Sequence, residues 1–216
     1  MAKRILNMTA EEMTHATKSE LIEAIAGSEG RVLASETIGI TIPLLTDVTN
    51  AEFAASMGAD LILLNMFDVQ EPKIMALPEV EKEETVREVK RLTGRMVGIN
   101  LEPVEESYAS DNKETLWEMS AGRYATVENA IQAQKMGVDL IVLTGNPGNG
   151  VSNPAIISSL KAISEAVGEK IMLAAGKMHA SGIIGEGGEN IITKEDIRQF
   201  AEAGADIILL PAPGTV

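Results

Sequence analysis

A short pattern recurs three times along the chain: a helix-like segment ends in Gly, a small residue and Asp follow, and a block of Leu, Ile and Val comes next. The three copies cover residues 57–64, 136–143 and 203–210. Glycine suits the left-handed backbone position at which many helices end. A short continuous apolar block is typical of a parallel strand that is buried on both faces. Each copy therefore predicts a helix that leads into a buried strand.

Three further apolar runs, at residues 31–36, 96–101 and 170–176, lie between these copies. Together the runs predict six strands, which start near residues 31, 60, 96, 139, 171 and 206. Helix-start signals lie between them: Thr9 with Glu12, Thr49 with Glu52 and Thr193 with Asp196 have capping-box spacing, and Thr126 precedes a further helical pattern. Because strands and helices alternate, we predict an α/β fold built of parallel β-α-β units.

The spacing of the repeated Asp residues favours one α/β architecture. Asp60 and Asp139 are 79 residues apart, and Asp139 and Asp206 are 67 apart. Each interval spans two units, which gives about 36 residues per unit, so eight units would need roughly 320 residues, a size usual for a (β/α)₈ barrel of the TIM type. We therefore predict that residues 1–216 form a single domain with six of the eight units of such a barrel. The alternative is an open, doubly wound six-stranded sheet.

The barrel interpretation carries expectations for both ends of the domain. Segment 8–26 should form a helix before the first strand and lie at the bottom of the barrel. Six strands of a barrel leave the first and the sixth with unpaired backbone groups, and an edge of that kind promotes association. We therefore expect either two further C-terminal units or another subunit, as in a homo-oligomer, to close the gap.

Composition narrows the range of functions. The chain has no Cys, which excludes disulfides, cysteine zinc sites, iron–sulfur clusters and thiolate nucleophiles. Its formal net charge is −14 and only 3% of its residues are aromatic, so neither nucleic acid nor an anionic membrane is an expected partner. The start of the chain lacks the apolar stretch of a signal peptide, and no run approaches the ~20 apolar residues of a membrane span. We expect a cytoplasmic protein.

Polar residues follow each predicted strand, where parallel α/β proteins place their active sites. Glu36, Lys177 and His179 are the candidate catalytic residues. Lys177 and His179 are two positions apart in an extended segment, so their side chains point to the same side. Such a pair can move protons or, through the lysine, form a Schiff base with a carbonyl substrate. The alternative is an ion pair or a solvated loop.

Three carboxylates near strand ends suggest a metal site. Glu36, Asp68 and Glu102 could converge as oxygen ligands for Mg²⁺, which usually needs one or two protein carboxylates together with substrate oxygens. Carboxylates at loop starts are also common helix caps. Mg²⁺ is therefore the candidate cofactor, and a structural role for these residues is the alternative.

A glycine-rich loop at residues 145–150 follows the fourth predicted strand and precedes Ser152-Asn153-Pro154, a favourable helix start. Free N–H groups at a helix start bind anions, so the loop could hold a phosphate or carboxylate, although a simple tight turn is the alternative. Its spacing is not the dinucleotide fingerprint, and Val151 stands at the lysine position of a Walker loop. The predicted substrate-binding residues are Asn65, Asn100, Asn146, Gly148, Gly150, Gly214 and Thr215.

Several strings are similar to known families. SETIG, GADLILLNMFDV, GINLEPV, DLIVLTGNPGNGVSN, LAAGKMHA, GENIITKEDI and GADIILLPAPGTV together resemble an uncharacterised bacterial TIM-barrel family labelled "PEP phosphonomutase" or "haloacid dehalogenase-like hydrolase". The resemblance covers nearly the whole chain, and members of that family continue through two further units. A more distant similarity, through GADLILLNMFD and VLTGNPG, is to the BtpA photosystem-assembly family, whose members are also predicted barrels.

The residues argue against the hydrolase label. Haloacid dehalogenases need an Asp-x-Asp motif at the end of the first strand, where this chain has Ser35-Glu36-Thr37, and Asp47 has no second Asp two residues on. The phosphonomutase label implies a small phosphorylated or 2-oxo acid and an acid-rich Mg²⁺ site. The Glu-Asp-Lys motif of those enzymes has no counterpart in this chain.

Two functional hypotheses follow. The first is an enzyme that binds a small anionic metabolite, phosphorylated or a 2-oxo acid, and performs lyase, isomerase or epimerase chemistry in which Lys177 or His179 moves a proton. The second is a barrel that has kept its ligand site but serves as a sensor or an assembly factor.

Overall fold

Six parallel strands form one sheet in the order in which they occur along the chain. The computed structural model describes residues 3–105, 119–145, 150–176 and 193–210. A sequential order agrees with a barrel, because a doubly wound sheet reverses its strand order at a switch point. The strands are β1 (Ala34–Ile38), β2 (Leu61–Asn65), β3 (Met96–Leu101), β4 (Leu140–Leu143), β5 (Met172–Gly176) and β6 (Ile207–Leu209).

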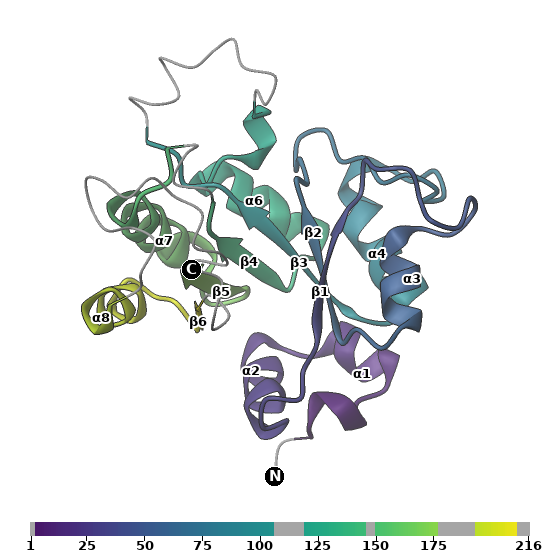
Figure 1. The fold of residues 1–216 in the computed structure, drawn as a ribbon, viewed down its shortest axis with the longest axis horizontal. Coiled ribbons are helices and arrows are strands. Elements are labelled where there is room, and N and C mark those ends of the chain that lie inside the picture. The colour runs from purple at the N-terminus through teal and green to yellow at the C-terminus, as the bar shows by residue number, and fades with distance from the viewer. Residues whose placement is uncertain (1–2, 106–118, 146–149, 177–192, 211–216) are drawn as a thin grey trace.

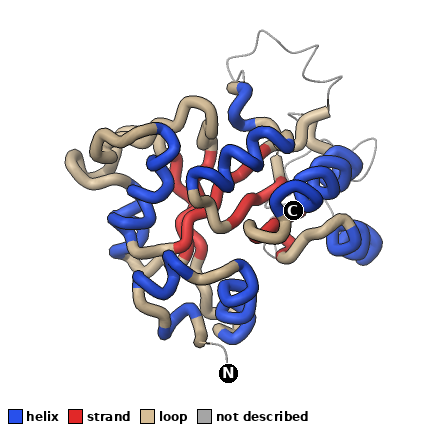
Figure 2. The backbone as a smooth tube through the Cα atoms, turned by 180° about the vertical axis from the view of Figure 1, so that it is seen from behind, coloured by secondary structure: helices blue, strands red, loops and turns tan. Residues whose placement is uncertain are grey.

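Helices connect the strands and cover the outer face of the sheet (Figure 1 and, from behind, Figure 2). Two short 3-10 turns precede α4 and α6, and no helix in the described part of the chain is long and apolar enough to cross a membrane. These elements are α3 (Asn50–Ser56), η2 (Lys82–Glu84), α4 (Thr85–Thr93), η3 (Ala121–Arg123), α6 (Val127–Met136), α7 (Asn153–Val167) and α8 (Lys194–Glu202).

Alternate side chains of the strands belong to two separate hydrophobic clusters. Ile62 and Leu64 of β2 pack in the cluster that includes residues of α3, α4, α6, α7 and α8. Leu61 and Leu63 of the same strand pack in the other cluster, together with residues of the N-terminal helices. The helices that connect the strands therefore lie on one side only, as a barrel requires. The predicted barrel-type α/β fold is confirmed, and the doubly wound alternative is not observed.

The N-terminal segment covers the amino end of the inner face (Figure 1), but it is not the single helix predicted for residues 8–26. The division arises because Thr17 begins a second capping box with Glu20, whose carboxylate accepts the Thr17 N–H at 2.8 Å. A capping residue has an extended backbone, so it ends the preceding helix as it starts the next. The resulting elements are η1 (Ile5–Asn7), α1 (Ala10–His15) and α2 (Lys18–Gly27).

The other predicted helix boundaries are confirmed. The glycine that ends each repeated helix has a positive φ, which glycine adopts without steric cost. These glycines are Gly58, Gly137 and Gly204. The predicted N-terminal caps, each of which accepts the N–H of the residue three positions on, are Thr9, Thr49, Thr126 and Thr193.

The Asp of each repeat has a structural role that the pattern alone does not reveal. Its N–H donates to the carbonyl of a residue at the start of the preceding strand, and its carboxylate accepts the N–H of that same residue, with N–O distances of 2.8 or 2.9 Å. These bonds join successive strands at the amino end of the sheet, where parallel α/β proteins place stabilising rather than catalytic residues. The pairs are Leu33 with Asp60, Val97 with Asp139, and Leu173 with Asp206.

Two of these carboxylates are also paired with lysines. Lys90 of α4 lies 2.7 Å from Asp139, and Lys18 of α2 lies 2.8 Å from Asp206. Burial raises the pKa of the Asp139 carboxyl, although the charge and hydrogen bond of Lys90 oppose the shift. The Lys18 pair connects the N-terminal helices to the start of β6.

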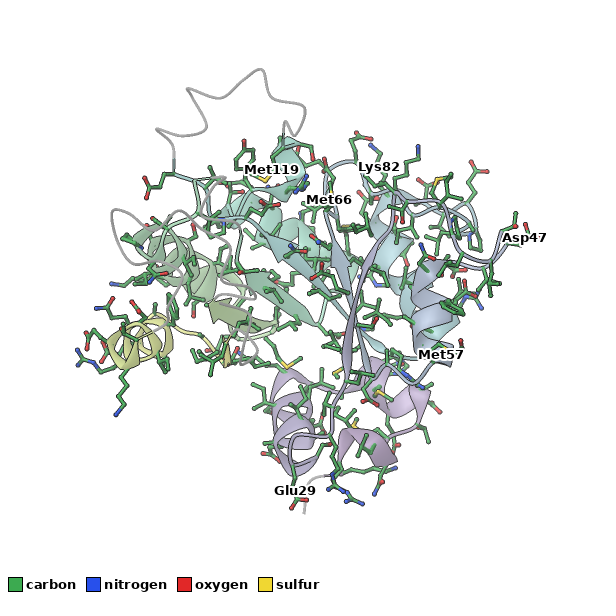
Figure 3. The ribbon with its side chains drawn as sticks, viewed as in Figure 1. Glu29, Asp47, Met57, Met66, Lys82 and Met119 are labelled. Carbon is green, nitrogen blue, oxygen red and sulfur yellow. The ribbon has the colours of Figure 1, made fainter. Side chains whose placement is uncertain are left out.

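The surface between β1 and α3 is exposed, although the equivalent surface of a later repeat is buried. Met57 and Met136 occupy the same position of the repeat, yet Met57 is 71% exposed and Met136 is fully buried. Helix α6 has a neighbouring helix on each side, α4 and α7, whereas within the described residues α3 packs beside one such helix, α4. A groove of about 590 Å³ therefore remains between β1 and α3, and Ile42, Leu44 and Phe53 are among its lining residues. Figure 3 shows Met57 at the outer surface of the molecule.

We expect this face to be covered in solution, because exposed apolar surface and unpaired strand edges favour association. Light scattering of the 216-residue chain should report an assembly larger than one subunit. Amide hydrogen exchange at residues 34–38 should be slow. A stable monomer with rapid exchange along β1 would contradict this prediction.

Candidate active site at the carboxyl ends of the strands

The loops that follow the strands lie at the end of the sheet opposite to the N-terminal helices. Figure 3 shows Met66, directly after β2, and Met119, shortly before η3, at one end of the molecule and Glu29, after α2, at the other. Active sites of parallel α/β barrels occur at the carboxyl ends of the strands. Met66 and Met119 therefore mark the end at which a site is expected.

Glu36, Asn65 and Asn100 come from three neighbouring strands and face the inside of the barrel. Leu63 belongs to the inner cluster and is in register with Glu36 on one side and with Gly98 on the other. Side chains two residues apart on a strand share a face. Asn65 and Asn100 therefore lie on the same inner face as Glu36, near the carboxyl ends of β2 and β3.

These three side chains form a hydrogen-bonded row. Asn100 Nδ2 donates to Asn65 Oδ1 at 2.9 Å, and Asn65 Nδ2 donates to Glu36 Oε1 at 2.6 Å. Asn65 Oδ1 also accepts the N–H of Met66 at 2.7 Å. Both ends of the Asn65 amide are therefore used, which fixes its orientation. The row holds one carboxylate oxygen of Glu36 in place, while the other has no donor in the described part of the chain.

Two further features of this row are unusual for a purely structural contact. Met66 has a φ of +56°, which is uncommon for a residue other than glycine, and strained backbone of this kind concentrates at functional sites. Asn100 Oδ1 is buried and has no hydrogen-bond partner within the described residues. A buried acceptor without a donor costs about 1–3 kcal/mol, and a substrate hydroxyl or a water molecule would remove that cost.

The position of Glu36 differs from the prediction. The sequence places Ser35-Glu36-Thr37 after the first strand, but the structure places them inside β1, which begins at Ala34 and not near residue 31. Leu33 instead bonds to the backbone and the carboxylate of Asp60. Because the pairing with β2 continues to Ile38, opposite Asn65, Glu36 lies where its carboxylate reaches Asn65.

Glu102 lies two residues beyond Asn100 and forms a largely buried ion pair. Its carboxylate accepts a hydrogen bond from Nη2 of Arg123. The backbone holds the two residues together as well, because the Glu102 N–H donates to the Arg123 carbonyl at 2.8 Å. Sequence reasoning did not identify Arg123, since no local motif connects it to a partner 21 residues earlier.

Asp68 stabilises the turn that follows β2. One of its oxygens accepts the N–H of Gln70 at 2.7 Å and that of Glu71 at 3.0 Å. Burial by itself would raise the pKa of the Asp68 carboxyl, but hydrogen bonds from Ser120, Glu71 and Gln70 and the charge of Arg123 hold it below its ordinary value. Asp68 is therefore an ionised carboxylate whose hydrogen bonds organise the loop.

The three predicted Mg²⁺ ligands do not form a common site. Glu36 is bound to Asn65, Asp68 to backbone N–H groups and Glu102 to Arg123. Within the described ranges, no three His, Asp or Glu side chains lie together in a way that could hold a metal ion. One oxygen of each of the other two carboxylates already accepts hydrogen bonds from the protein: Asp68 Oδ1 accepts two backbone N–H groups, and Glu102 Oε1 pairs with Arg123.

The start of α7 offers fewer anion-binding groups than the sequence suggests. Pro154 has no N–H, and the N–H groups of Ala155 and Ile156 donate to the hydroxyl and the carbonyl of Ser152. The Ser152 hydroxyl in turn donates to the carboxylate of Glu105. A carboxylate of the chain itself therefore lies at this end of α7.

The structure does not test the substrate contacts predicted for the remaining residues. Gly150 has a φ of +79° and allows the turn before α7, and its proposed substrate contact stays a prediction. The predicted residues that lie outside the described part of the chain are Asn146, Gly148, Lys177, His179, Gly214 and Thr215.

Comparisons with known proteins agree with this architecture. A family model described as a domain of unknown function (DUF7916) matches residues 6–216. The structure of 2,3-dimethylmalate lyase, a member of the PEP mutase/isocitrate lyase superfamily, is similar with a TM-score of 0.53 and 12% identity, over 93% of this chain and 62% of the lyase. A candidate phosphonomutase from Burkholderia cenocepacia J2315 gives 0.50 and 17% identity, over 83% of this chain and 68% of its own. A search of curated protein sequences gives no match.

At these identities the structural similarity shows the fold alone. The chain spans 62% of the length of the lyase, so the activity of that enzyme is not carried over. The similarity to the phosphonomutase group is confirmed at the level of the fold. The rejection of the hydrolase label and the distant resemblance to the BtpA family stay predictions.

Proposed function

The chain belongs to the DUF7916 family, and we propose that it is an enzyme that performs lyase, isomerase or epimerase chemistry on a small phosphorylated or 2-oxo acid. The observation that carries the proposal is the hydrogen-bonded row of Glu36, Asn65 and Asn100 on the inner face at the carboxyl ends of β1 to β3. A shared fold with 2,3-dimethylmalate lyase and a candidate phosphonomutase supports a reaction of this kind.

In this proposal Glu36 is the group that takes a proton from the substrate. Asn65 fixes one oxygen of the carboxylate, so the second oxygen has a defined direction, and a base held in a defined direction is effective in proton transfer. Asn100 Oδ1 accepts a hydrogen bond from a substrate hydroxyl. Lys177 and His179 are proposed as a second proton-transfer group, and Asn146, Gly148, Gly214 and Thr215 as contacts to the anionic group.

The test is the exchange of carbon-bound hydrogen for solvent deuterium. Proton NMR in D₂O would follow a panel of 2-oxo acids and sugar phosphates with the full chain. Glu36→Gln should slow the exchange by about 10²–10⁴-fold, because glutamine keeps the bond to Asn65 but cannot accept the proton. Lys177→Ala and His179→Ala should also slow it.

Glu128→Gln is the matched control, because Glu128 is an exposed carboxylate in the first turn of α6 and its loss should leave the exchange rate unchanged. Exchange that persists in Glu36→Gln would assign the base to another residue. Ligand binding without exchange across the whole panel would overturn the enzyme proposal in favour of a sensor or assembly factor.

A further inference from the structure

Arg123 brings a largely buried positive charge to the carboxyl end of the barrel. Its side chain is 16% exposed and pairs with Glu102, which follows β3 on the inner face by strand alternation. The lysine pairs Lys18 with Asp206 and Lys90 with Asp139 lie instead at the amino ends of the strands. Arg123 is thus a cation at the functional end of a strongly acidic chain.

The backbone around Arg123 is fixed to the ends of β2 and β3. The Val69 N–H donates to the Gly122 carbonyl at 3.2 Å, and the Ala125 N–H donates to the Glu102 carbonyl at 3.0 Å. The Asn129 side chain donates to the carbonyls of residues 121 and 124 at 2.8 and 2.9 Å. These bonds position η3 and the following residues through the backbone and the Asn129 side chain, and none of them involves the guanidinium.

The donors of the guanidinium are not all used. An arginine has five N–H donors, and Nη2 of Arg123 donates to Glu102. Nε is buried and has no hydrogen-bond partner within the described residues. Asn100 Oδ1, on the same strand face as Glu102, is a buried acceptor that also has no hydrogen-bond partner within the described residues. One donor and one acceptor at the end of β3 therefore lack partners.

The charges near these two atoms limit the groups that they can bind. The guanidinium lies close enough to Asp68 to lower the pKa of that carboxyl and is bonded to Glu102, so two carboxylates and one cation leave a net charge of −1. A second full anion at Nε would be repelled by both carboxylates. A neutral carbonyl oxygen would not be, and a hydroxyl group is the donor that Asn100 Oδ1 lacks.

We propose that Arg123 takes the role at this site that the sequence assigned to Mg²⁺, and that its Nε donates to the carbonyl oxygen of a hydroxylated carbonyl substrate whose hydroxyl donates to Asn100. The inference rests on the proposed function and names the substrate class of that same site. When Glu36 takes the proton next to the carbonyl, the electrons of the C–H bond form a carbon–carbon double bond. The carbonyl π electrons then move to oxygen, and Arg123 stabilises the resulting enolate oxyanion.

Hydroxyacetone, a neutral molecule with one carbonyl and one hydroxyl, is the probe. Arg123→Lys keeps a cation for Glu102 and Asp68 but lacks the Nε donor. In EDTA-treated full chain, ligand-observed NMR should show hydroxyacetone binding to the wild type that is about 10- to 100-fold weaker in Arg123→Lys. Arg91→Lys, at an exposed arginine that pairs with Glu88, is the matched control and should bind as the wild type does. Thermal unfolding checks that both variants fold.

A Mn²⁺ titration followed by electron paramagnetic resonance gives an independent measurement. If Arg123 replaces a metal ion, Glu102→Gln should leave the Mn²⁺ binding of the wild type unchanged. A Mn²⁺ site that is present in the wild type and absent in Glu102→Gln would overturn the inference. Equal hydroxyacetone binding by wild type and Arg123→Lys would also overturn it, while loss of deuterium exchange in Glu36→Gln would leave the proposed function standing. Weaker binding in Arg123→Lys together with unchanged exchange in Glu36→Gln would support the Arg123 contact and reject Glu36 as the base.

Discussion

Replacement of Lys90 by Met should lower the free energy of unfolding by about 3–5 kcal/mol at pH 7. Lys90 Nζ lies 2.7 Å from Asp139 Oδ1, and both side chains are 11% exposed. Methionine fills a similar volume but leaves a buried carboxylate without a counterion. Asp139 must remain in place because its other oxygen accepts the N–H of Val97 in β3. Urea unfolding at pH 7 measures the loss.

The loss should become smaller in acid. Burial already raises the pKa of Asp139 while Lys90 is present, and removal of Lys90 should raise it further. A carboxyl with a raised pKa in the folded state contributes its stability fully below its unfolded pKa, and this contribution is lost as the pH rises through the folded pKa. Unfolding curves of Lys90→Met should therefore approach those of the wild type near pH ~4.

Arg198→Met is the matched control for this prediction, because Arg198 forms an exposed pair with Glu195 on α8. Its loss should cost at most about 1 kcal/mol at either pH. A Lys90→Met variant that loses the same free energy at pH 4 and pH 7 would contradict the assignment of the effect to the charge of Asp139.

Replacement of Phe200 by Ala should cost about 3–5 kcal/mol and should release α8 from the sheet. Phe200 is fully buried in the outer cluster, and it is the buried side chain that α8 contributes to the core. The rest of this helix is largely polar and carries exposed ion pairs. This aromatic ring is therefore the main apolar contact between α8 and the outer cluster.

Chemical denaturation measures the total loss, and amide hydrogen exchange locates it. Exchange should accelerate in residues 194–209 more than in β2 and β3. Glu202→Ala, an exposed change on the same helix, should alter stability by no more than about 0.5 kcal/mol. A Phe200→Ala variant that destabilises all six strands equally would show that α8 unfolds only together with the whole sheet.

The candidate site was predicted in part. Polar residues at strand ends identified Glu36, Asn65 and Asn100 as members of one site, and the structure joins these three by hydrogen bonds. Position after a strand was sufficient for this, because parallel strands bring their carboxyl ends to the same edge of the sheet. Which of their atoms bond, and which atom remains without a partner, depends on the register of the strands.

Within the described residues, the structure does not gather the three predicted metal ligands into one group. Glu102 and Asp68 are carboxylates at suitable places in the sequence, but Glu102 Oε1 pairs with Arg123 and Asp68 Oδ1 accepts two backbone N–H groups. The partner of Glu102 is Arg123, from the segment that precedes α6, and the partners of Asp68 include Ser120. A pattern read along the chain shows where carboxylates occur, and it does not show which cation or N–H group the fold brings to them.

The sequence by itself determined the order and type of the elements. The Gly-x-Asp repeat, the apolar blocks and the threonine caps are local signals, and they determine where helices end and strands begin because backbone conformation and capping depend on near neighbours. The same local signals gave the parallel, sequential sheet, since an alternation of strands and helices leaves few other arrangements. Two elements differ from the prediction. The first strand begins later, because its polar residues are part of the strand that pairs with β2, and segment 8–26 divides into two helices.

Tertiary structure alone decided what the charged residues do. The Asp of each repeat bonds to the preceding strand. Lys90 of α4 forms an ion pair with Asp139, and Arg123 forms one with Glu102. Each of these contacts joins residues 21 to 49 positions apart. Electrostatic partnership depends on distance in space and on burial, which a linear pattern does not contain.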